Sequence, residues 1–458
     1  MSLPIPKLTR RGFIQVGTVG VAGYSLLPMI KPRNVQAAGK AQLRGGAEVC
    51  ILFFLQGGPS QLDTFGAKEG PWTPKDFDIR TVKSGLRMPA ALLPKLSERA
   101  DKFSVIQSLE SWEADHGRGT YYLQAGRIIS PARLAEIPSV GSIMAYETLS
   151  RAKNSDFLPP FIAMNLDSSM LVGPGILPSN NAPMLMSTSA PAPFLVPEAE
   201  KPGFARKRAL LRQLDSEWRE EDTHRGRIFS DLDHYYESAF PLLDSPKASP
   251  IFRIQPDDHA RYGNSPVGDA CIMARNLVRA EAGTRFIFIA HNGWDLHDKL
   301  YDKSAKNNQY KMCGQLDPAL SSLLDDLEGN SDAKGRQLID KTFIACMGEF
   351  GRTPGQPNLR GGRDHYRYAA VALFAGAGVK GGRVIGGTDE NAAHVVNPGW
   401  HRSRSVYPED VLVTMYSVMG VDWRKRVTQT PSGRAFEYIE DISPKGVMVF
   451  DEISELFA

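Results

Sequence analysis

The stretch Arg285-Phe-Ile-Phe-Ile-Ala-His291-Asn-Gly-Trp-Asp-Leu-His297 guides the interpretation of the whole chain. Its first half is almost wholly apolar and is bounded by Gly283 and Gly293, a pattern typical of a strand buried on both faces. Its second half places Asp295 and His297 beyond the carboxyl end of that strand. Open α/β sheets bind ligands at this end, and a carboxylate beside an imidazole suits a divalent metal ion. Taken alone, the stretch fits a helix cap and a solvent-facing histidine equally well.

The 458-residue chain has the composition of a soluble globular protein, with 42% hydrophobic and 23% charged residues. Its length corresponds to two or three domains, or to one large α/β domain with insertions. The formal net charge is +3. Because residues 1–38 contain five basic residues and no acidic one, the rest of the chain is slightly acidic. The composition therefore gives no indication of nucleic-acid binding.

The amino-terminal segment, residues 1–38, has the pattern of a twin-arginine export signal. Arg10 and Arg11 precede a glycine-rich aliphatic run at residues 16–30, and small residues follow at 35–37. The run is short for a permanent membrane helix, so we expect a cleaved signal, with a retained anchor as the alternative. The protein is then expected in the periplasm or outside the cell. Its partner would be the twin-arginine export machinery, which carries folded proteins, so a cofactor can be bound before export.

The four cysteines are scattered along the chain. None belongs to a Cys-x-x-Cys pair or to a zinc knuckle. We therefore expect no dense disulfide framework, although the spacing is compatible with a single bridge.

Apolar runs alternate with amphipathic segments from residue 47 to residue 440. Strands are expected at 49–55, 103–107, 161–164, 285–291, 342–347 and 369–374, and helices at 139–149, 270–282, 310–327 and 408–419. This alternation predicts an α/β fold with a mostly parallel central sheet and helices on both faces. Residues 171–265 are interpreted as a helical and loop insertion. Residues 441–458 are interpreted as a carboxyl-terminal tail.

Polar clusters follow the ends of three of the expected strands. Their carboxylates and imidazoles could hold one or two divalent ions. The residues concerned are Asp63, Asp295, His297, Glu349, Asp364 and His365.

Arginines and a helix start accompany these clusters. A helix is expected to begin near His116, and such an end favours anions. Arg118, Arg352 and Arg363 could grip an anion in a bidentate manner. Each could equally belong to an ordinary structural Arg–Asp pair, and Asp115 could be a simple N-cap.

Four motifs, in this order, resemble those of an uncharacterised exported bacterial family. They are Leu55-Gln-Gly-Gly-Pro-Ser-Gln-Leu-Asp-Thr-Phe65, Gly293-Trp-Asp-Leu-His297, Gly348-Glu-Phe-Gly-Arg-Thr-Pro354 and Gly362-Arg-Asp-His-Tyr366. The family is a domain of unknown function in the alkaline phosphatase and sulfatase superfamily, and the resemblance covers residues 47–440. It implies an alkaline-phosphatase-like α/β fold and no established activity.

The resemblance also bears on the nucleophile. The nucleophile motif of sulfatases ends in Leu-Thr-Gly-Arg, which is similar to Leu123-Gln-Ala-Gly126-Arg127. This alignment places His116 at the nucleophile position, where superfamily members have Ser, Thr or a formylglycine precursor. A histidine there could bind metal or accept a phosphoryl group.

The superfamily's metal motifs are matched only in part. Glu349 keeps a carboxylate where the superfamily has Ser-Asp-His-Gly, but Phe350 replaces a ligand. The Asp that usually ends the first strand is Gln56, for which Asp63 is a candidate substitute. His365 resembles the late metal-binding histidine. These departures argue against a two-metal site and leave one metal or none.

The sequence thus predicts an exported metal-dependent hydrolase of phosphate or sulfate esters, with an anionic small molecule or glycan ester as substrate. His116 or a metal-bound water would attack, and Arg118 or Arg352 would hold the anion. The alternative is a non-catalytic exported protein that keeps the fold for binding or assembly, which the altered nucleophile favours. The divalent ion, zinc, calcium or manganese, is expected on Asp295, His297, Glu349, Asp364 and His365, with Asp63 as a further ligand.

Overall fold

The computed structural model describes residues 41–458 except 84, 190–199, 222–241 and 243–245. The chain divides into two compact units, Met1–Ala41 and Gln42–Ala458, and every element below belongs to the second. The predicted export signal at 1–38 and part of the predicted insertion at 171–265 lie outside the described residues. Within the described ranges, no helix has the length and apolar character needed to cross a membrane.

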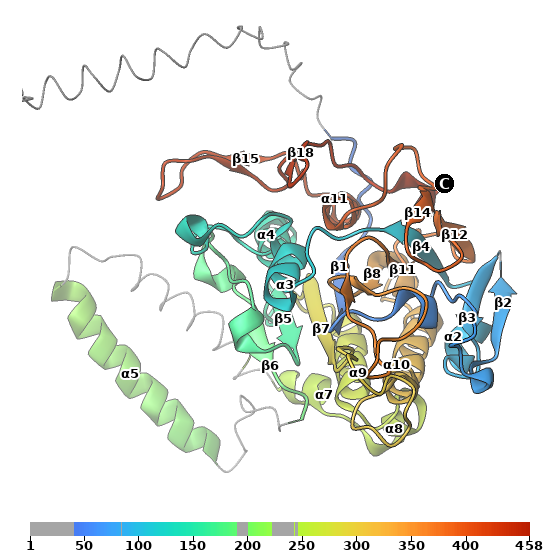
Figure 1. The fold of residues 1–458 in the computed structure, drawn as a ribbon. Coiled ribbons are helices and arrows are strands. Elements are labelled where there is room, and N and C mark those ends of the chain that lie inside the picture. The colour runs from blue at the N-terminus through green and yellow to red at the C-terminus, as the bar shows by residue number, and fades with distance from the viewer. Residues whose placement is uncertain (1–40, 84, 190–199, 222–241, 243–245) are drawn as a thin grey trace, which may run out of the picture. The chain divides into compact units, whose positions relative to one another are not determined.

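An eight-stranded sheet forms the centre of the second unit (Figure 1). Seven strands run in one direction, and the remaining one, β11, is antiparallel to both of its neighbours. In sheet order the strands are β12 (Arg383–Ile385), β4 (Phe103–Leu109), β11 (Ala370–Ala375), β8 (Thr342–Met347), β1 (Val49–Gln56), β7 (Phe286–Asn292), β5 (Phe161–Met164) and β6 (Met184–Met186).

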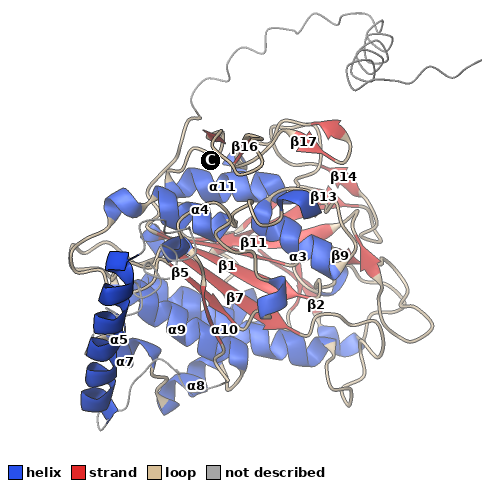
Figure 2. Cartoon of the chain, turned by 90° about the vertical axis from the view of Figure 1, so that its left-hand side faces the viewer, coloured by secondary structure: helices blue, strands red, loops and turns tan. Residues whose placement is uncertain are grey.

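Helices cover both faces of the sheet, as Figure 2 shows. One face carries α3 (His116–Ala125), α4 (Val140–Glu147) and α11 (Pro408–Met419), and the other carries α9 (Pro266–Ala280) and α10 (Gln309–Gly329). Against α9 and α10 pack α2 (Pro94–Glu98), α7 (Ala248–Phe252) and α8 (Pro256–Tyr262). The predicted α/β architecture, a mostly parallel sheet between helical layers, is confirmed. Within the predicted insertion, α5 (Lys201–Glu221) is helical.

The central strands are apolar on both faces because both faces are covered. Along β1, Ile51 and Phe53 belong to the core beneath α9 and α10. Successive side chains of a strand point to opposite faces, so Leu52 and Phe54 point toward the other helical layer, and both are fully buried. A continuous apolar run is therefore what this position in the sheet requires.

Five small two-stranded sheets and several short 3-10 helices complete the described elements. The strand pairs are β2 (Ile79–Lys83) with β3 (Leu86–Pro89), β9 (Gly351–Arg352) with β10 (His365–Tyr366), β13 (Gly387–Thr388) with β14 (Val395–Asn397), β15 (Arg426–Val427) with β16 (Phe436–Glu437), and β17 (Ile442–Ser443) with β18 (Gly446–Val447). The 3-10 helices are Gln61–Asp63, Lys75–Phe77, Pro131–Arg133, Leu149–Arg151, Ser168–Met170, Ser179–Asn181, Ile339–Lys341 and Ser454–Leu456.

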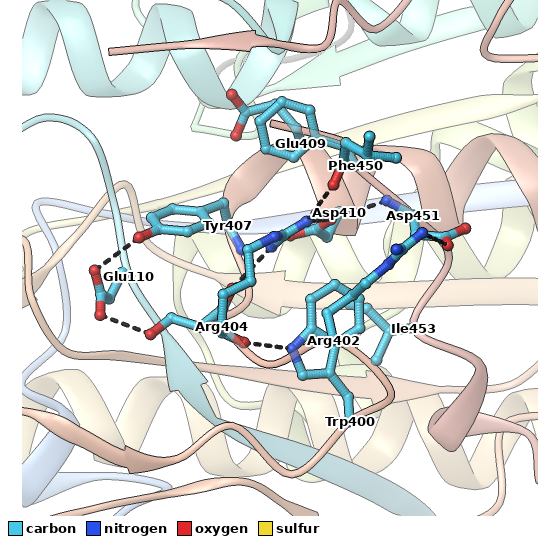
Figure 3. A network of polar contacts seen from close by, with 12 residues as sticks. Glu110, Trp400, Arg402, Arg404, Tyr407, Glu409, Asp410, Phe450, Asp451 and Ile453 are labelled. Atoms are coloured by element: carbon cyan, nitrogen blue, oxygen red, sulfur yellow. Dashed lines mark hydrogen bonds and ion pairs between the residues drawn. The ribbon is translucent and has the colours of Figure 1, made fainter. Parts of the chain in front are cut away.

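The last residues of the chain pack against the start of α11. Arg404 donates to both carboxylate oxygens of Asp410, at 2.6 and 2.8 Å, and the backbone N–H of Asp451 donates to the same carboxylate at 3.0 Å (Figure 3). Phe450, next to this network, is buried. Residues 441–458, interpreted from the sequence as a tail, are thus held to α11 by a buried carboxylate and by apolar contacts.

Candidate metal centre

The polar loops that follow β1, β7 and β8 meet at one edge of the sheet. These strands are parallel neighbours at its centre, so their carboxyl ends share an edge. β7 leads to Asp295 and His297, and β8 leads to Glu349. Two histidines from other elements reach the same place, His116 from the first turn of α3 and His365 from β10.

Four side chains, which we call the metal group, direct ligand atoms into one small volume: His116, Asp295, His297 and His365. Oδ1 of Asp295 lies 3.2 Å from Nε2 of His116 and 3.0 Å from Nε2 of His297. Nε2 of His365 lies 3.3 Å from the same oxygen and 2.9 Å from Nε2 of His297. Tetrahedral bonds of about 2.0–2.1 Å would place neighbouring ligand atoms about 3.3 Å apart. The observed spacing therefore fits one ion at the centre of the metal group.

Each histidine of the metal group is also held at its other ring nitrogen, Nδ1. The partner is always an oxygen that can only accept a hydrogen bond, so Nδ1 donates to it, and in the neutral imidazole Nε2 keeps a lone pair facing the centre. Metal-binding histidines are commonly fixed in this way. The pairs are His116 with Glu349 at 2.6 Å, His297 with Asp364 at 2.7 Å, and His365 with the carbonyl oxygen of Ala114 at 2.8 Å.

Glu349 is positioned by the tight turn after β1. Its side chain is fully buried, and its carboxylate accepts the backbone N–H of Gly57 at 3.0 Å. Gly57 has a φ of +112°, and a Cβ at that position would lie 2.4 Å from the backbone nitrogen of Asp295. Only glycine fits such a conformation and such a close approach. The Gly-Gly turn thus brings the Glu349 carboxylate and the backbone of Asp295 together.

Arg352 supports Asp295 from below the surface. Its side chain is 2% exposed, and it lies 2.5 Å from Oδ1 of Asp295. The same guanidinium donates to the carbonyl oxygens of Gly57, Gly58 and Arg363. The sequence suggested Arg352 as an anion-binding residue, but this buried arrangement directs its donors to the protein and to Asp295.

Asp63 lies apart from the metal group. It forms a buried ion pair with Arg363 at 2.9 Å, and it accepts hydrogen bonds from Ser60 and from the Tyr301 hydroxyl. A buried guanidinium needs such a partner, and both carboxylate oxygens of Asp63 are occupied here. The structure therefore does not bring this expected ligand to the centre.

Arg118 lies on the exposed side of the first turn of α3. Its side chain pairs with Glu113 at 2.8 Å, and its backbone N–H is capped by Asp115 at 3.0 Å. Asp115 thus acts as the N-cap that the sequence suggested. The contacts of Arg118 are with these acidic neighbours rather than with the metal group.

The metal group is electrostatically coupled. Burial lowers the pKa of His116, but hydrogen bonds with Asp295 and Glu349 outweigh this effect and raise it to about 9. Burial acts to raise the pKa of Asp295, but hydrogen bonds from His116 and Arg352 hold it well below its usual range. The pKa of His365 is lowered, chiefly by burial, with a further contribution from the charge of Arg352. The Asp295 carboxylate is therefore ionised, and an ion that binds at Nε2 of His116 has to displace a proton from that nitrogen.

Phe350 forms an apolar wall beside the metal group. Its ring lies 5.1 Å from the ring of His116 and 4.6 Å from that of His365, measured between centroids. Phe350, which the sequence resemblance places at a ligand position, thus packs on two histidines. The contact restricts the orientation of both imidazoles.

Residues 47–445 match the model of a family described as a protein of unknown function, DUF1501. The chain belongs to the DUF1501 family. The resemblance drawn from the four sequence motifs to an uncharacterised family is thereby confirmed. A search of curated proteins finds no match to the chain.

Several solved structures are similar to this DUF1501 chain. One is a protein in the alkaline phosphatase superfamily from Vibrio parahaemolyticus, with 11% identity, 84% of this chain and 69% of that chain covered, and a TM-score of 0.40. Another is the PsFucS1 sulfatase from Pseudoalteromonas sp., with 13% identity, coverage of 90% and 72%, and a TM-score of 0.38. A third is a phosphonate monoester hydrolase of Agrobacterium radiobacter, with 11% identity, coverage of 89% and 77%, and a TM-score of 0.36.

The DUF1501 structure separates the predicted site residues into those that face the centre of the metal group and those that lie behind it. Asp295, His297 and His365 face the centre together with His116, whereas Glu349 and Asp364 bind the outer ring nitrogens, Nδ1, of His116 and His297. Sequence reasoning missed two further supports: the Ala114 carbonyl, which binds His365, and Asn358, which donates to Asp364 at 3.2 Å. A backbone carbonyl has no sequence signature. Asn358 lies six residues before Asp364, and this short spacing is the one sequence feature that could have indicated their contact.

Proposed function

We propose that this DUF1501 protein binds one divalent metal ion at the metal group and hydrolyses phosphate or sulfate esters there. One observation carries the proposal: three imidazole Nε2 atoms and Oδ1 of Asp295 converge, while every Nδ1 is anchored by an acceptor. Such anchoring orients a metal ligand and raises its basicity. In an ordinary surface cluster of histidines, nothing requires every Nδ1 to be held by an acceptor.

The donor set favours zinc among the three expected ions. Imidazole nitrogen suits zinc and neighbouring transition metals, whereas calcium takes six to eight oxygen ligands. Three imidazoles and one carboxylate therefore fit zinc first and manganese second. Calcium fits this donor set poorly.

The ring nitrogens of His116 are both engaged in this arrangement. Nδ1 donates to Glu349, and Nε2 faces Asp295 and the centre. His116 then acts as a ligand, and no lone pair is left for attack on an ester. A bound divalent ion would polarise the ester oxygen and activate a water molecule, so that no protein nucleophile is required.

Substrate access follows from the exposure of the ligands. The side chain of Asp295 is 45% exposed, and those of His297 and His365 are part-exposed. An anionic small molecule or glycan ester can therefore approach from this side of the metal group. Arg352 and Glu349 lie beneath and hold the ligands in place.

The test begins with metal analysis of protein purified without chelator or affinity tag. Zinc- or manganese-loaded protein is then assayed on p-nitrophenyl phosphate, bis(p-nitrophenyl) phosphate and p-nitrophenyl sulfate. We expect one ion per chain and turnover of an ester that His297→Ala abolishes. His401→Ala, which removes a part-exposed histidine outside the metal group, is the matched control and should keep the activity. If folded, metal-loaded protein hydrolyses none of these esters, the proposed hydrolase activity is contradicted.

One observation favours a second function, that of an exported binding or assembly protein stabilised by the metal. The metal group supplies four protein ligands, which is the ligand number of structural zinc sites, whereas catalytic zinc sites keep a position open. In this case metal removal would lower the unfolding temperature, and no ester would be hydrolysed at any metal loading.

A further inference from the structure

The arginines around the metal group differ in whether their guanidinium donors are available. Arg352 and Arg363 are 2% and 1% exposed and donate to protein oxygens. Arg118 is exposed but pairs with Glu113 at 2.8 Å. Arg360 is 63% exposed, and the one contact described for its guanidinium is with Asp364, at a long 3.4 Å.

The backbone that carries Arg360 is fixed beside His297. The Lys299 N–H donates to the Arg360 carbonyl at 3.0 Å, and Asn358 donates from its side chain to the His297 carbonyl at 3.1 Å. At Gly362 a Cβ would lie 2.1 Å from the carbonyl carbon of His297, so only glycine allows this approach. The base of the side chain is thus held rigidly while its charged end is in solvent.

Asp364 links Arg360 to the metal group. Its Oδ1 lies 2.7 Å from Nδ1 of His297 and 3.4 Å from Nη2 of Arg360. The guanidinium is therefore one carboxylate and one imidazole ring away from the centre. A planar guanidinium with free donors binds two oxygens of a phosphate or sulfate group side by side.

We propose that Arg360 binds the anionic oxygens of a phosphate or sulfate group that sits at the metal group. The proposal rests on the proposed function, and it names the substrate class as esters that keep a free anionic oxygen at the reacting centre. The exposed side chain rotates from Asp364 to the substrate, while the loop that holds it stays in place. Asp364 remains on Nδ1 of His297 in both positions.

The experiment measures anion binding directly and independently of turnover. Inorganic phosphate and sulfate are titrated by calorimetry into zinc-loaded wild type, Arg360→Gln, Arg360→Lys, Arg118→Gln and Leu359→Ala. We expect Arg360→Gln to weaken phosphate binding by about ten- to a hundredfold, the loss typical of one charge-assisted hydrogen-bonding group. Arg360→Lys should keep part of the affinity. Leu359→Ala, at the fully exposed neighbouring position, should keep all of it.

Zinc content and the kinetic constants complete the test. Arg360→Gln should keep full zinc content and, on p-nitrophenyl phosphate, should raise KM more than it lowers kcat. Unchanged phosphate affinity in Arg360→Gln would overturn the proposal, as would a loss confined to Arg118→Gln. If phosphate binding depends on Arg360 but no ester is hydrolysed, the anion-binding role of Arg360 is supported and the proposed hydrolase activity is contradicted. If esters are hydrolysed but phosphate affinity does not depend on Arg360, the hydrolase activity is supported and the role of Arg360 is contradicted.

Discussion

Glu349→Gln tests whether the hydrogen bond at Nδ1 of His116 sets the metal affinity. The buried Glu349 carboxylate accepts from both His116 and the Gly57 N–H. Glutamine has the same shape but only one acceptor oxygen. With that oxygen toward His116, it also keeps the Gly57 N–H at 3.0 Å, but it is an uncharged and weaker acceptor, and the amide nitrogen replaces the oxygen that lies 3.2 Å from the Gly57 nitrogen. With the amide toward His116, the imidazole must move its proton to Nε2 and loses the lone pair that faces the centre.

Either orientation should weaken metal binding. Loss of a hydrogen bond behind a metal ligand costs about 10- to 100-fold in affinity, or about 1.4 to 2.8 kcal/mol. Zinc affinity is measured by competition with a chromogenic chelator, and folding is checked by circular dichroism. Glu409→Gln is the matched control, because Glu409 is a buried carboxylate bonded to Trp112 and Tyr122. If Glu349→Gln is folded and binds zinc as tightly as wild type, the anchoring argument is wrong.

Three further predictions concern other parts of the chain. His297→Ala and His365→Ala should each lower zinc content at least tenfold with little loss of fold, since neither side chain belongs to the buried apolar core. Elemental analysis and circular dichroism check this, and full zinc occupancy in both variants would refute the ligand assignment. Burial raises the pKa of Glu409 from 4.5 to about 8. Between these pH values the folded state holds a proton that the unfolded state releases. The contribution of Glu409 to the free energy of unfolding therefore falls as pH rises from about 4.5 to about 8. Glu409→Gln should therefore gain in unfolding temperature relative to wild type between pH 5 and pH 9, and a constant difference would contradict the shift. Replacing Arg10 and Arg11 with Lys should block export, as measured by cell fractionation; normal appearance of the processed variant outside the cytoplasm would show that the signal is misassigned.

The sequence was a good guide to the central strands and a poor one to the edges of the sheet. The apolar runs of β1, β7 and β8 predict fully buried strands because burial on both faces leaves no alternation. β11 is as apolar as these strands, but its direction depends on the connection through β9 and β10, which no local pattern encodes. The three-residue strands β6 and β12 pair only at the rim, where little burial constrains their sequence.

The sequence indicated which residues lie near the candidate site, but not which of them face its centre and which lie behind. Asp295, His297 and His365 stand near strand ends that a parallel sheet brings together. Asp63 follows a strand of the same kind, but it meets Arg363, 300 positions away, and forms a buried pair. Whether a carboxylate reaches the centre or supports a ligand depends on a few ångströms of loop path, and spacing along the chain does not contain that information.

The anchored histidines also make the metal group a cross-link. His297 and His365 are 68 positions apart, and the His116–Glu349 bond spans 233 positions. The four cysteines are all buried and free, so no disulfide performs this task. An ion held by these segments would close long chain loops, as a covalent staple does. Because only the folded chain gathers the ligands, ion concentration would directly set the free energy of unfolding, by about 4 kcal/mol at a thousandfold excess over Kd. Metal supply in the compartment where the chain folds would then govern how long the protein survives there.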